Sequence, residues 1–303
     1  MLDIHTHLYW QSYDSDRDKV IHRARMAGVK QMIVVGTTPE ENTLAISIAE
    51  HYEDMFASIG LHPHFFNKSI EEEFSISNFQ FSMKPKIFNE KMQQEIEELK
   101  KLAMHSKVVA IGECGLDYYS HNQQETINSQ QRMLQKAGFI AQLELAVKLK
   151  VPVIIHTRPS LGTMDAYEDM WTILQQYSSD SSHLAPPMIL HCYQGDTEMT
   201  KKFLGLSSVY FSFTGNITYP TKKMFVGTKN DLTETVKMVP LTRLFVETDC
   251  PFLAPQEKRG ERNEPAYVTI VAEHICALHK VKMIDLEDNL EKNFVRVFAR
   301  PTL

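Results

Sequence analysis

The chain has 303 residues, 43% of them hydrophobic and 23% charged, so it is an ordinary globular sequence long enough to bury a large core. Its formal net charge of −6 excludes a global basic field, so any contact with nucleic acid has to be local or mediated by bound cations. We see no signal peptide and no apolar run near the roughly 20 residues of a membrane span, and the four cysteines show no CxxC spacing, so we predict a cytoplasmic protein, or a nuclear one if the source is eukaryotic.

Short apolar segments alternate with helical patterns along most of the chain. The segments read as parallel strands covered by helices. Helix boundaries carry local signals, such as Thr38 before Pro39 at a first helical position and Gly28 after the first helix. The predicted strands are residues 1–4, 31–35, 55–59, 108–111, 153–155, 188–190, 209–212 and 244–246. The predicted helices are residues 14–27, 39–52, 90–106, 123–150, 161–177, 197–204, 232–238, 266–279 and 285–298.

Eight strands, each followed by a helix, predict an α/β fold. We expect a (β/α)8 TIM barrel formed by residues 1–303 as a single domain, with an open doubly wound sheet as the alternative. Residues 65–89 and 215–230 do not fit a minimal barrel, and long loops in a compact domain are usually functional or disordered. Both stretches follow strands, so we expect extended βα loops on the face of the barrel that carries active sites.

Ionisable side chains lie at the carboxyl ends of at least six predicted strands, beginning with His5 and His7. A strand at the N-terminus would put these two imidazoles on one face. Any one such residue is more often an ordinary loop or turn residue, but chance would not place the whole set on one rim, the rim where barrel enzymes keep their active sites. The others are His62, His64, Glu113, Asp117, His156, Arg158, His191, Glu247 and Asp249.

Histidine mixed with carboxylate suits Zn, Mn or Ni better than the all-oxygen sets typical of Mg or Ca. Four histidines and two carboxylates are enough for two metals that share one carboxylate. Such a pair polarises the scissile group and activates a water. Cys114 stands next to a negative neighbour that disfavours a thiolate, so we interpret it as a packed small residue rather than a nucleophile.

These segments together resemble the TatD family of metal-dependent hydrolases, within the amidohydrolase-type barrels. Many related barrels bridge their metals with a carbamylated lysine at the end of the fourth strand, where this chain has Glu113. Residues 159–162 depart from the family pattern, so that position is given no role. The matching segments are residues 3–8, 60–64, 112–119, 152–158, 190–191, 240–251 and 262–265.

The resemblance implies a role for each matching residue. One metal site would use His5, His7, Glu113 and Asp249. The other would use Glu113, His156 and His191, with Glu113 as the bridge. Asp249 would also orient or deprotonate the nucleophilic water, so Asp249 and Glu113 are the predicted catalytic residues. His62, His64 and Arg158 would face the substrate phosphate, where a guanidinium forks onto two oxygens. Asp117 is predicted to support a metal-ligating histidine from behind.

We therefore predict a metal-dependent deoxyribonuclease, either a 3′→5′ exonuclease or an endonuclease. It would act as a monomer, with two divalent ions (Zn, Mn, Mg or Ni), on single-stranded or damaged DNA ends, and without a membrane.

An amide, ester or aminoacyl-tRNA-type hydrolase with the same dinuclear site is the alternative, and the acidic net charge mildly favours it. A non-enzymatic, metal-stabilised interaction module fits less well, because structural metal sites are usually closed and rich in cysteine. A local basic groove would favour the nuclease, although its members could equally be solvated surface: Lys84, Lys86, Lys222, Lys223, Arg259 and Arg262.

Overall fold

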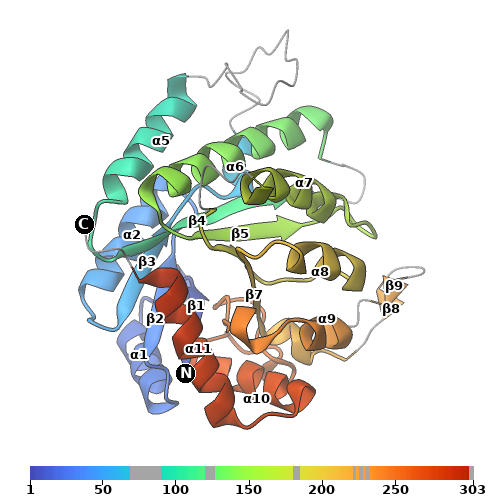
Figure 1. The fold of residues 1–303 in the computed structure, drawn as a ribbon. Coiled ribbons are helices and arrows are strands. Elements are labelled where there is room, and N and C mark those ends of the chain that lie inside the picture. Colours follow the sequence, from blue (N-terminus) through green and yellow to red (C-terminus); the bar gives the residue numbers. More distant parts are fainter. Residues whose placement is uncertain are drawn as a thin grey trace.

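A computed structural model of the chain describes residues 1–68, 90–119, 127–179, 185–220, 223–224, 228–229 and 232–299. Eight parallel strands form one sheet, and their spatial order follows the chain (Figure 1). Most residues of these strands are buried, as expected when helices cover one face and the barrel interior the other. The strands are β1 (Leu2–Thr6), β2 (Gln31–Val35), β3 (Met55–Ile59), β4 (Val108–Asp117), β5 (Val153–Arg158), β6 (Met188–Leu190), β7 (Val209–Phe213) and β10 (Leu244–Val246).

The two ends of the sheet meet just beyond β1 and β10. Thr6 forms a parallel bridge with Cys250. The amide of His7 donates to the Cys250 carbonyl at 2.9 Å, and the amide of Asp249 donates to the His5 carbonyl at 3.0 Å. The sheet is therefore a nearly closed barrel. This confirms the predicted (β/α)8 fold and excludes an open doubly wound sheet.

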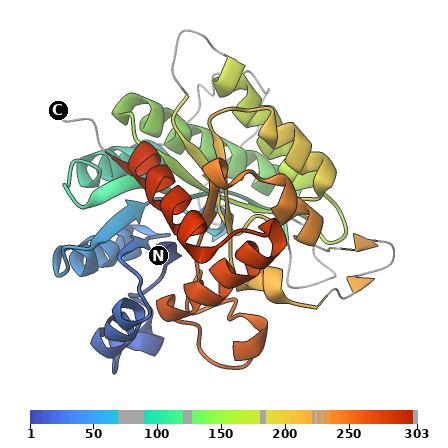
Figure 2. The same cartoon turned by 60° about the horizontal axis from the view of Figure 1, so that its bottom comes forward.

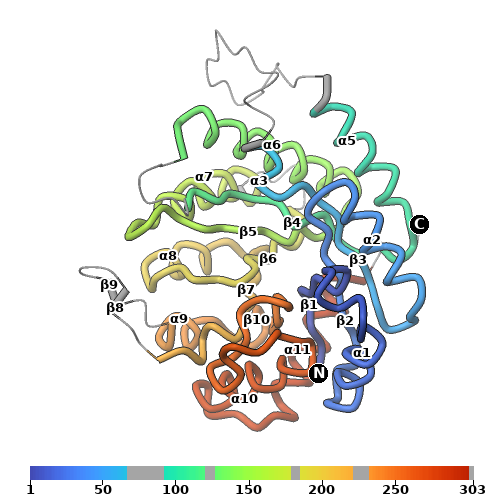
Figure 3. The backbone as a smooth tube through the Cα atoms, turned by 180° about the vertical axis from the view of Figure 1, so that it is seen from behind, coloured from blue at the N-terminus to red at the C-terminus, as the bar shows by residue number. Residues whose placement is uncertain are grey.

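Helices surround the strands on the outside (Figures 1 and 3). The N-terminus lies beside the last helix, α11, where the Met1 ammonium pairs with Glu287 at 3.2 Å (Figure 2). No helix in the described part of the chain has both the length and the apolar character that a bilayer crossing requires. The helices are α1 (Arg17–Met26), α2 (Pro39–Glu50), α3 (Pro63–Lys68), α5 (Glu90–Leu102), α6 (Ser129–Leu149), α7 (Asp165–Ser179), α8 (Thr197–Leu204), α9 (Leu232–Met238), α10 (Val268–His279) and α11 (Met283–Phe298).

Side-chain caps decide where several helices begin. The Thr38 side chain accepts a hydrogen bond from the Glu41 amide, and Pro39 follows as predicted. Asn128 and Gln131 form a capping box, so α6 begins at Ser129 and not at residue 123. The short helix α3 was not predicted.

The predicted bounds of β2, β3, β6 and β10 are correct, but β4 was wrongly ended at residue 111. Gly112 and Gly115 have the composition of a turn, yet both lie inside the strand with φ of 138° and 147°. A Cβ at Gly112 would lie 2.3 Å from the Ile154 carbonyl oxygen, and one at Gly115 would lie 2.0 Å from that of His156. These glycines let β4 approach β5 closely, which places Glu113 next to His156.

The two predicted long loops are only partly within the described residues. Of the stretch 65–89, residues 65–68 belong to α3, and residues 69–89 lie outside the described residues. Of the stretch 215–230, residues Gly215–Thr218 form a 3-10 turn, and a two-stranded antiparallel ladder joins β8 (Lys223–Met224) to β9 (Thr228–Lys229).

Candidate active site

The predicted site residues meet in one cavity of about 930 Å³. His5 lies just beneath it and is fully buried. The polar side chains come from different strands, so the barrel and not any local segment assembles them. Those that line the cavity are His7, His62, His64, Glu113, Asp117, His156, Arg158, His191 and Asp249.

Glu113 stands at the centre, and its two carboxylate oxygens face different partners. Oε2 lies 3.4 Å from Nε2 of His5 and 3.9 Å from Nε2 of His7. Oε1 lies 2.7 Å from Nδ1 of His156 and 3.8 Å from Nε2 of His191. One buried carboxylate therefore joins two groups of imidazoles.

Asp249 completes the first of these groups. Its Oδ1 lies 3.3 Å from Nε2 of His7 and 3.8 Å from Nε2 of His5. Its backbone has a φ of 57°, an uncommon conformation for a residue other than glycine. The same residue hydrogen-bonds to the His5 carbonyl, so barrel closure places this carboxylate.

The donor set fits divalent metal ions. Two groups of ligand atoms lie close enough to hold a cation. One is the first predicted set without Glu113, namely His5, His7 and Asp249, and the other is the second predicted set, Glu113, His156 and His191. The Nε2 atoms of His5 and His7 face each other at 3.3 Å between two carboxylates, an arrangement typical of nitrogens that share a cation. His62, Asp117 and His156 form a further group of the same kind, as do His5, His191 and Glu247.

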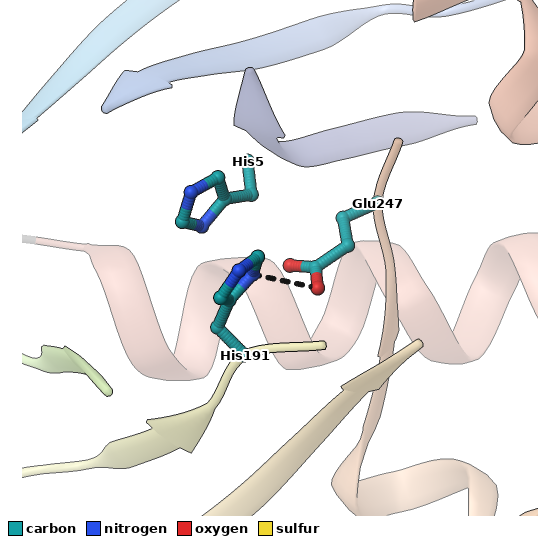
Figure 4. A group of neighbouring side chains, drawn as sticks. All are labelled: His5, His191 and Glu247. Atoms are coloured by element: carbon teal, nitrogen blue, oxygen red, sulfur yellow. Dashed lines mark ion pairs between the residues drawn. The ribbon is translucent and has the colours of Figure 1, made fainter. Parts of the chain in front are cut away.

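Neighbouring groups fix the orientation of two of the imidazoles. Nδ1 of His7 lies 2.9 Å from the Val35 carbonyl oxygen, which can only accept a hydrogen bond. Nδ1 of His191 lies 2.8 Å from Oε1 of the fully buried Glu247 (Figure 4). In His7, Nδ1 is therefore the donor, which leaves the Nε2 lone pair directed toward the cavity. In His191, the Glu247 carboxylate lies beside Nδ1 as an ion-pair partner.

His156 lies between two carboxylates. Its Nδ1 faces Glu113, and its Nε2 lies 3.3 Å from Oδ2 of Asp117. Asp117 was predicted to contact a metal-ligating histidine on the side away from the metal. Burial favours the neutral ring, but the bonds to Asp117 and Glu113 outweigh it and raise the pKa of His156 to about 10. Burial likewise opposes charge on His191, yet Glu247 and Glu113 raise its pKa to about 9.

The pKa values of the two acids Glu113 and Asp249 are lowered. Burial disfavours the Glu113 carboxylate, but His62, His156 and His5 together hold its pKa well below the ordinary value. Burial also disfavours the Asp249 carboxylate, and His7 with His191 lowers its pKa overall. Negative oxygens are therefore kept at the centre of the site.

The three residues predicted to face a phosphate reach the same cavity in different ways. His62 lies 3.7 Å from Oε1 of Glu113, and burial lowers its pKa to about 3. His64 is more exposed and lies 3.0 Å from Oδ2 of Asp117. The Arg158 guanidinium lies over the Tyr119 ring, 3.8 Å from its centroid. Their roles toward substrate stay predictions.

Two buried acids behind the site were given no role from the sequence. Glu247 lies beside Nδ1 of His191. It directly follows β10, and other site residues also follow their strands directly, so its position in the sequence indicated a place at the site. Asp3 accepts from the Thr248 hydroxyl at 2.6 Å and from the Thr248 amide at 3.0 Å, which ties β1 to the segment that carries Asp249. Burial raises the pKa of Asp3 to about 8. Cys114 is fully buried, as its interpretation as a packed residue required.

The proposed basic groove is only partly within the described residues. Lys84, Lys86 and Lys222 lie outside them, as does the side chain of Lys223. Arg262 pairs with both Asp16 oxygens at 2.9 and 2.8 Å, and Arg259 lies over the Tyr219 ring. The two described arginines are thus held by other parts of this chain.

Comparisons with known proteins agree with this geometry. The model of the family described as TatD-related DNase matches residues 2–299. The chain is 34% identical to the uncharacterized metal-dependent hydrolase YabD of Bacillus subtilis, over 98% of each protein. It is 29% identical to the 3′-5′ ssDNA/RNA exonuclease TatD of Escherichia fergusonii, over 91% of this chain and 90% of that protein.

A solved structure shows the same fold. YjjV, a TatD homologue from Escherichia coli, superimposes with a TM-score of 0.77 at 24% identity, covering 99% of this chain and 98% of that one. The match to the family, the relatives named as metal-dependent hydrolases and the clustered histidine and carboxylate ligands support one conclusion. The chain belongs to the TatD family of metal-dependent hydrolases.

Proposed function

We propose that this protein is a deoxyribonuclease that hydrolyses phosphodiester bonds with two divalent cations. The observation that carries the proposal is the position of Glu113, whose two oxygens face His5 with His7 on one side and His156 with His191 on the other. The relative named as a single-stranded DNA and RNA exonuclease supports the substrate class. Action as a monomer on single-stranded or damaged ends, in the cytoplasm, stays part of this proposal.

In this proposal His5, His7, Asp249 and Glu113 hold one cation, and Glu113, His156 and His191 hold the other. When bound, the cations acidify a water and neutralise charge on the phosphate oxygens. Asp249 is placed beside the first group with a lowered pKa, so it is ionised and able to orient the water and accept its proton. Arg158, His62 and His64 contact the phosphate in this proposal, and His62 lies on the side of Glu113 that faces His156.

The substrate class is tested by salt dependence. Purified protein with Mn²⁺ or Mg²⁺ is expected to degrade a single-stranded oligonucleotide. Its affinity for that oligonucleotide should fall with salt, with a log–log slope of about −0.7 for each phosphate neutralised. Fluorescence anisotropy with the Asp249→Asn variant measures binding without cleavage. A flat salt response, together with hydrolysis of an uncharged ester and an intact oligonucleotide, would favour the amide or ester alternative.

Cation binding should strengthen as the pH rises. The raised pKa values of His156 and His191, about 10 and about 9, leave both rings protonated at neutral pH in the cation-free protein. A ligand must lose its proton to bind, and the deprotonated fraction grows about tenfold per pH unit below the pKa. The Kd for Mn²⁺ should therefore fall by up to about tenfold per proton released for each unit between pH 6 and pH 8.

Isothermal titration calorimetry in two buffers of different ionisation enthalpy measures both the Kd and the number of protons released. A His105→Gln variant, which changes a histidine outside the cavity, should release as many protons as the parent protein. A Kd that is independent of pH, with no proton release, would contradict the assignment of His156 and His191 as ligands.

A further inference from the structure

Two exposed aromatic side chains meet at the mouth of the cavity. Trp10 is 41% exposed and Phe252 is 42% exposed, and both line the cavity that holds the histidine and carboxylate cluster. Their ring centroids are 5.0 Å apart, and the rings are nearly perpendicular. Single exposed apolar residues are common, but a contacting aromatic pair beside a polar cavity indicates a binding surface.

The pair lies next to the proposed cation ligands. The Phe252 ring centroid is 6.2 Å from that of His7, and Phe252 follows Asp249 by three residues. Trp10 follows His7 by three residues. A molecule that presents a phosphate to His7 and Asp249 therefore has its neighbouring group beside these two rings.

The backbone under each ring is held in place. The Trp10 amide donates to the His7 carbonyl at 3.0 Å, and the Phe252 amide donates to the Asp249 carbonyl at 2.9 Å. The Phe252 carbonyl accepts from the side chain of Asn263, which is fully buried and also donates to the Thr248 carbonyl. The rings are exposed on fixed turns, so a ligand that stacks on them does not have to order the loop first.

We infer that Trp10 and Phe252 form a stacking platform for the nucleobase of the nucleotide whose phosphate lies at His7 and Asp249. This inference rests on the proposed phosphodiesterase function. Stacking on aromatic side chains tolerates any base, since every base has a π-face. It also adds affinity to that of the Arg158 contact, because the chain is acidic overall and the two described arginines of the predicted basic groove, Arg259 and Arg262, contact Tyr219 and Asp16.

Tryptophan fluorescence tests the platform directly. The chain contains two tryptophans, Trp10 and Trp171, so a Trp171→Phe variant carries Trp10 alone. With Mg²⁺ present and excitation at the red edge, deoxyadenosine 5′-monophosphate should quench Trp10 saturably. Deoxyribose 5-phosphate, which has the same sugar and phosphate but no base, should not quench it.

Calorimetric titration of surface variants gives the magnitude. Trp10→Ala and Phe252→Ala should each weaken binding of deoxyadenosine 5′-monophosphate by roughly 5- to 100-fold, the range of a lost stacking contact, and leave deoxyribose 5-phosphate binding within about twofold. Trp10→Phe keeps an aromatic ring and should restore most of the affinity. Ile284→Ala, at an exposed apolar position of α11 that does not line the cavity, should change neither.

The outcomes separate the platform from the proposed function. Equal binding of the nucleotide and the sugar phosphate, unchanged in Trp10→Ala and Phe252→Ala, would overturn the platform even if the protein cleaves DNA. Failure of the protein to bind either phosphate or to cleave an oligonucleotide would overturn the proposed function and the platform with it.

Discussion

Glu113→Gln is expected to abolish hydrolysis and to remove bound cation from both ligand groups. The amide keeps the shape of the side chain but loses its charge and turns one oxygen into a donor. Both oxygens are in use, one toward His5 and His7 and the other toward His156 and His191. Hydrolysis should fall by at least about 10³-fold, the scale expected when a group that stabilises transition-state charge is removed.

Elemental analysis of dialysed protein gives the cation content, and cleavage of a labelled oligonucleotide gives the rate. Glu144→Gln, an exposed glutamate on α6, is the matched control and should change neither value. Circular dichroism and thermal melting show whether each variant is folded. A folded Glu113→Gln protein with full cation content and near-normal cleavage would refute the shared-carboxylate site.

The fold was predictable because parallel strands are short apolar runs that stand out against helical patterns. The bounds of β2, β3, β6 and β10 follow from that contrast alone. The end of β4 was missed because Gly112 and Gly115 have the composition of a turn. Their actual function depends on the approach of β5, whose carbonyls at Ile154 and His156 leave no space for a side chain. That contact lies in tertiary structure, and local sequence does not encode it.

The gathering of the site residues was predictable from topology, since parallel strands in a barrel place all their carboxyl ends on one rim. The structure brings together every side chain predicted for the two cation sites. Sequence alone does not say which carboxylate oxygen faces which imidazole, or that Glu247 fixes the ring of His191 (Figure 4). The contact of Trp10 with Phe252 was missed for a similar reason, because it exists only where β1 meets β10 at the closure of the barrel.

Asp249→Asn is expected to remove one cation and spare the other, in contrast to Glu113→Gln. Asp249 contacts His7 and His5 through Oδ1, and it belongs to no ligand group with His156. The Glu113, His156 and His191 group should therefore keep its cation, and the cation content should fall by about half. Hydrolysis should still fall by about 10²- to 10³-fold, because a proton acceptor and a negative ligand are lost together.

Kinetics and a double variant make this prediction sharp. The loss should appear in kcat more than in KM, since the proposed function assigns Asp249 to the water and Arg158 to the phosphate. The double variant Glu113→Gln with Asp249→Asn should be no slower than Glu113→Gln alone, because residues that act as one unit are not additive. Asp288→Asn, an exposed aspartate on α11, should leave rate and cation content unchanged. Loss of both cations in Asp249→Asn would mean that the two ligand groups bind as a single unit, and retention of both with normal kcat would remove Asp249 from the site altogether.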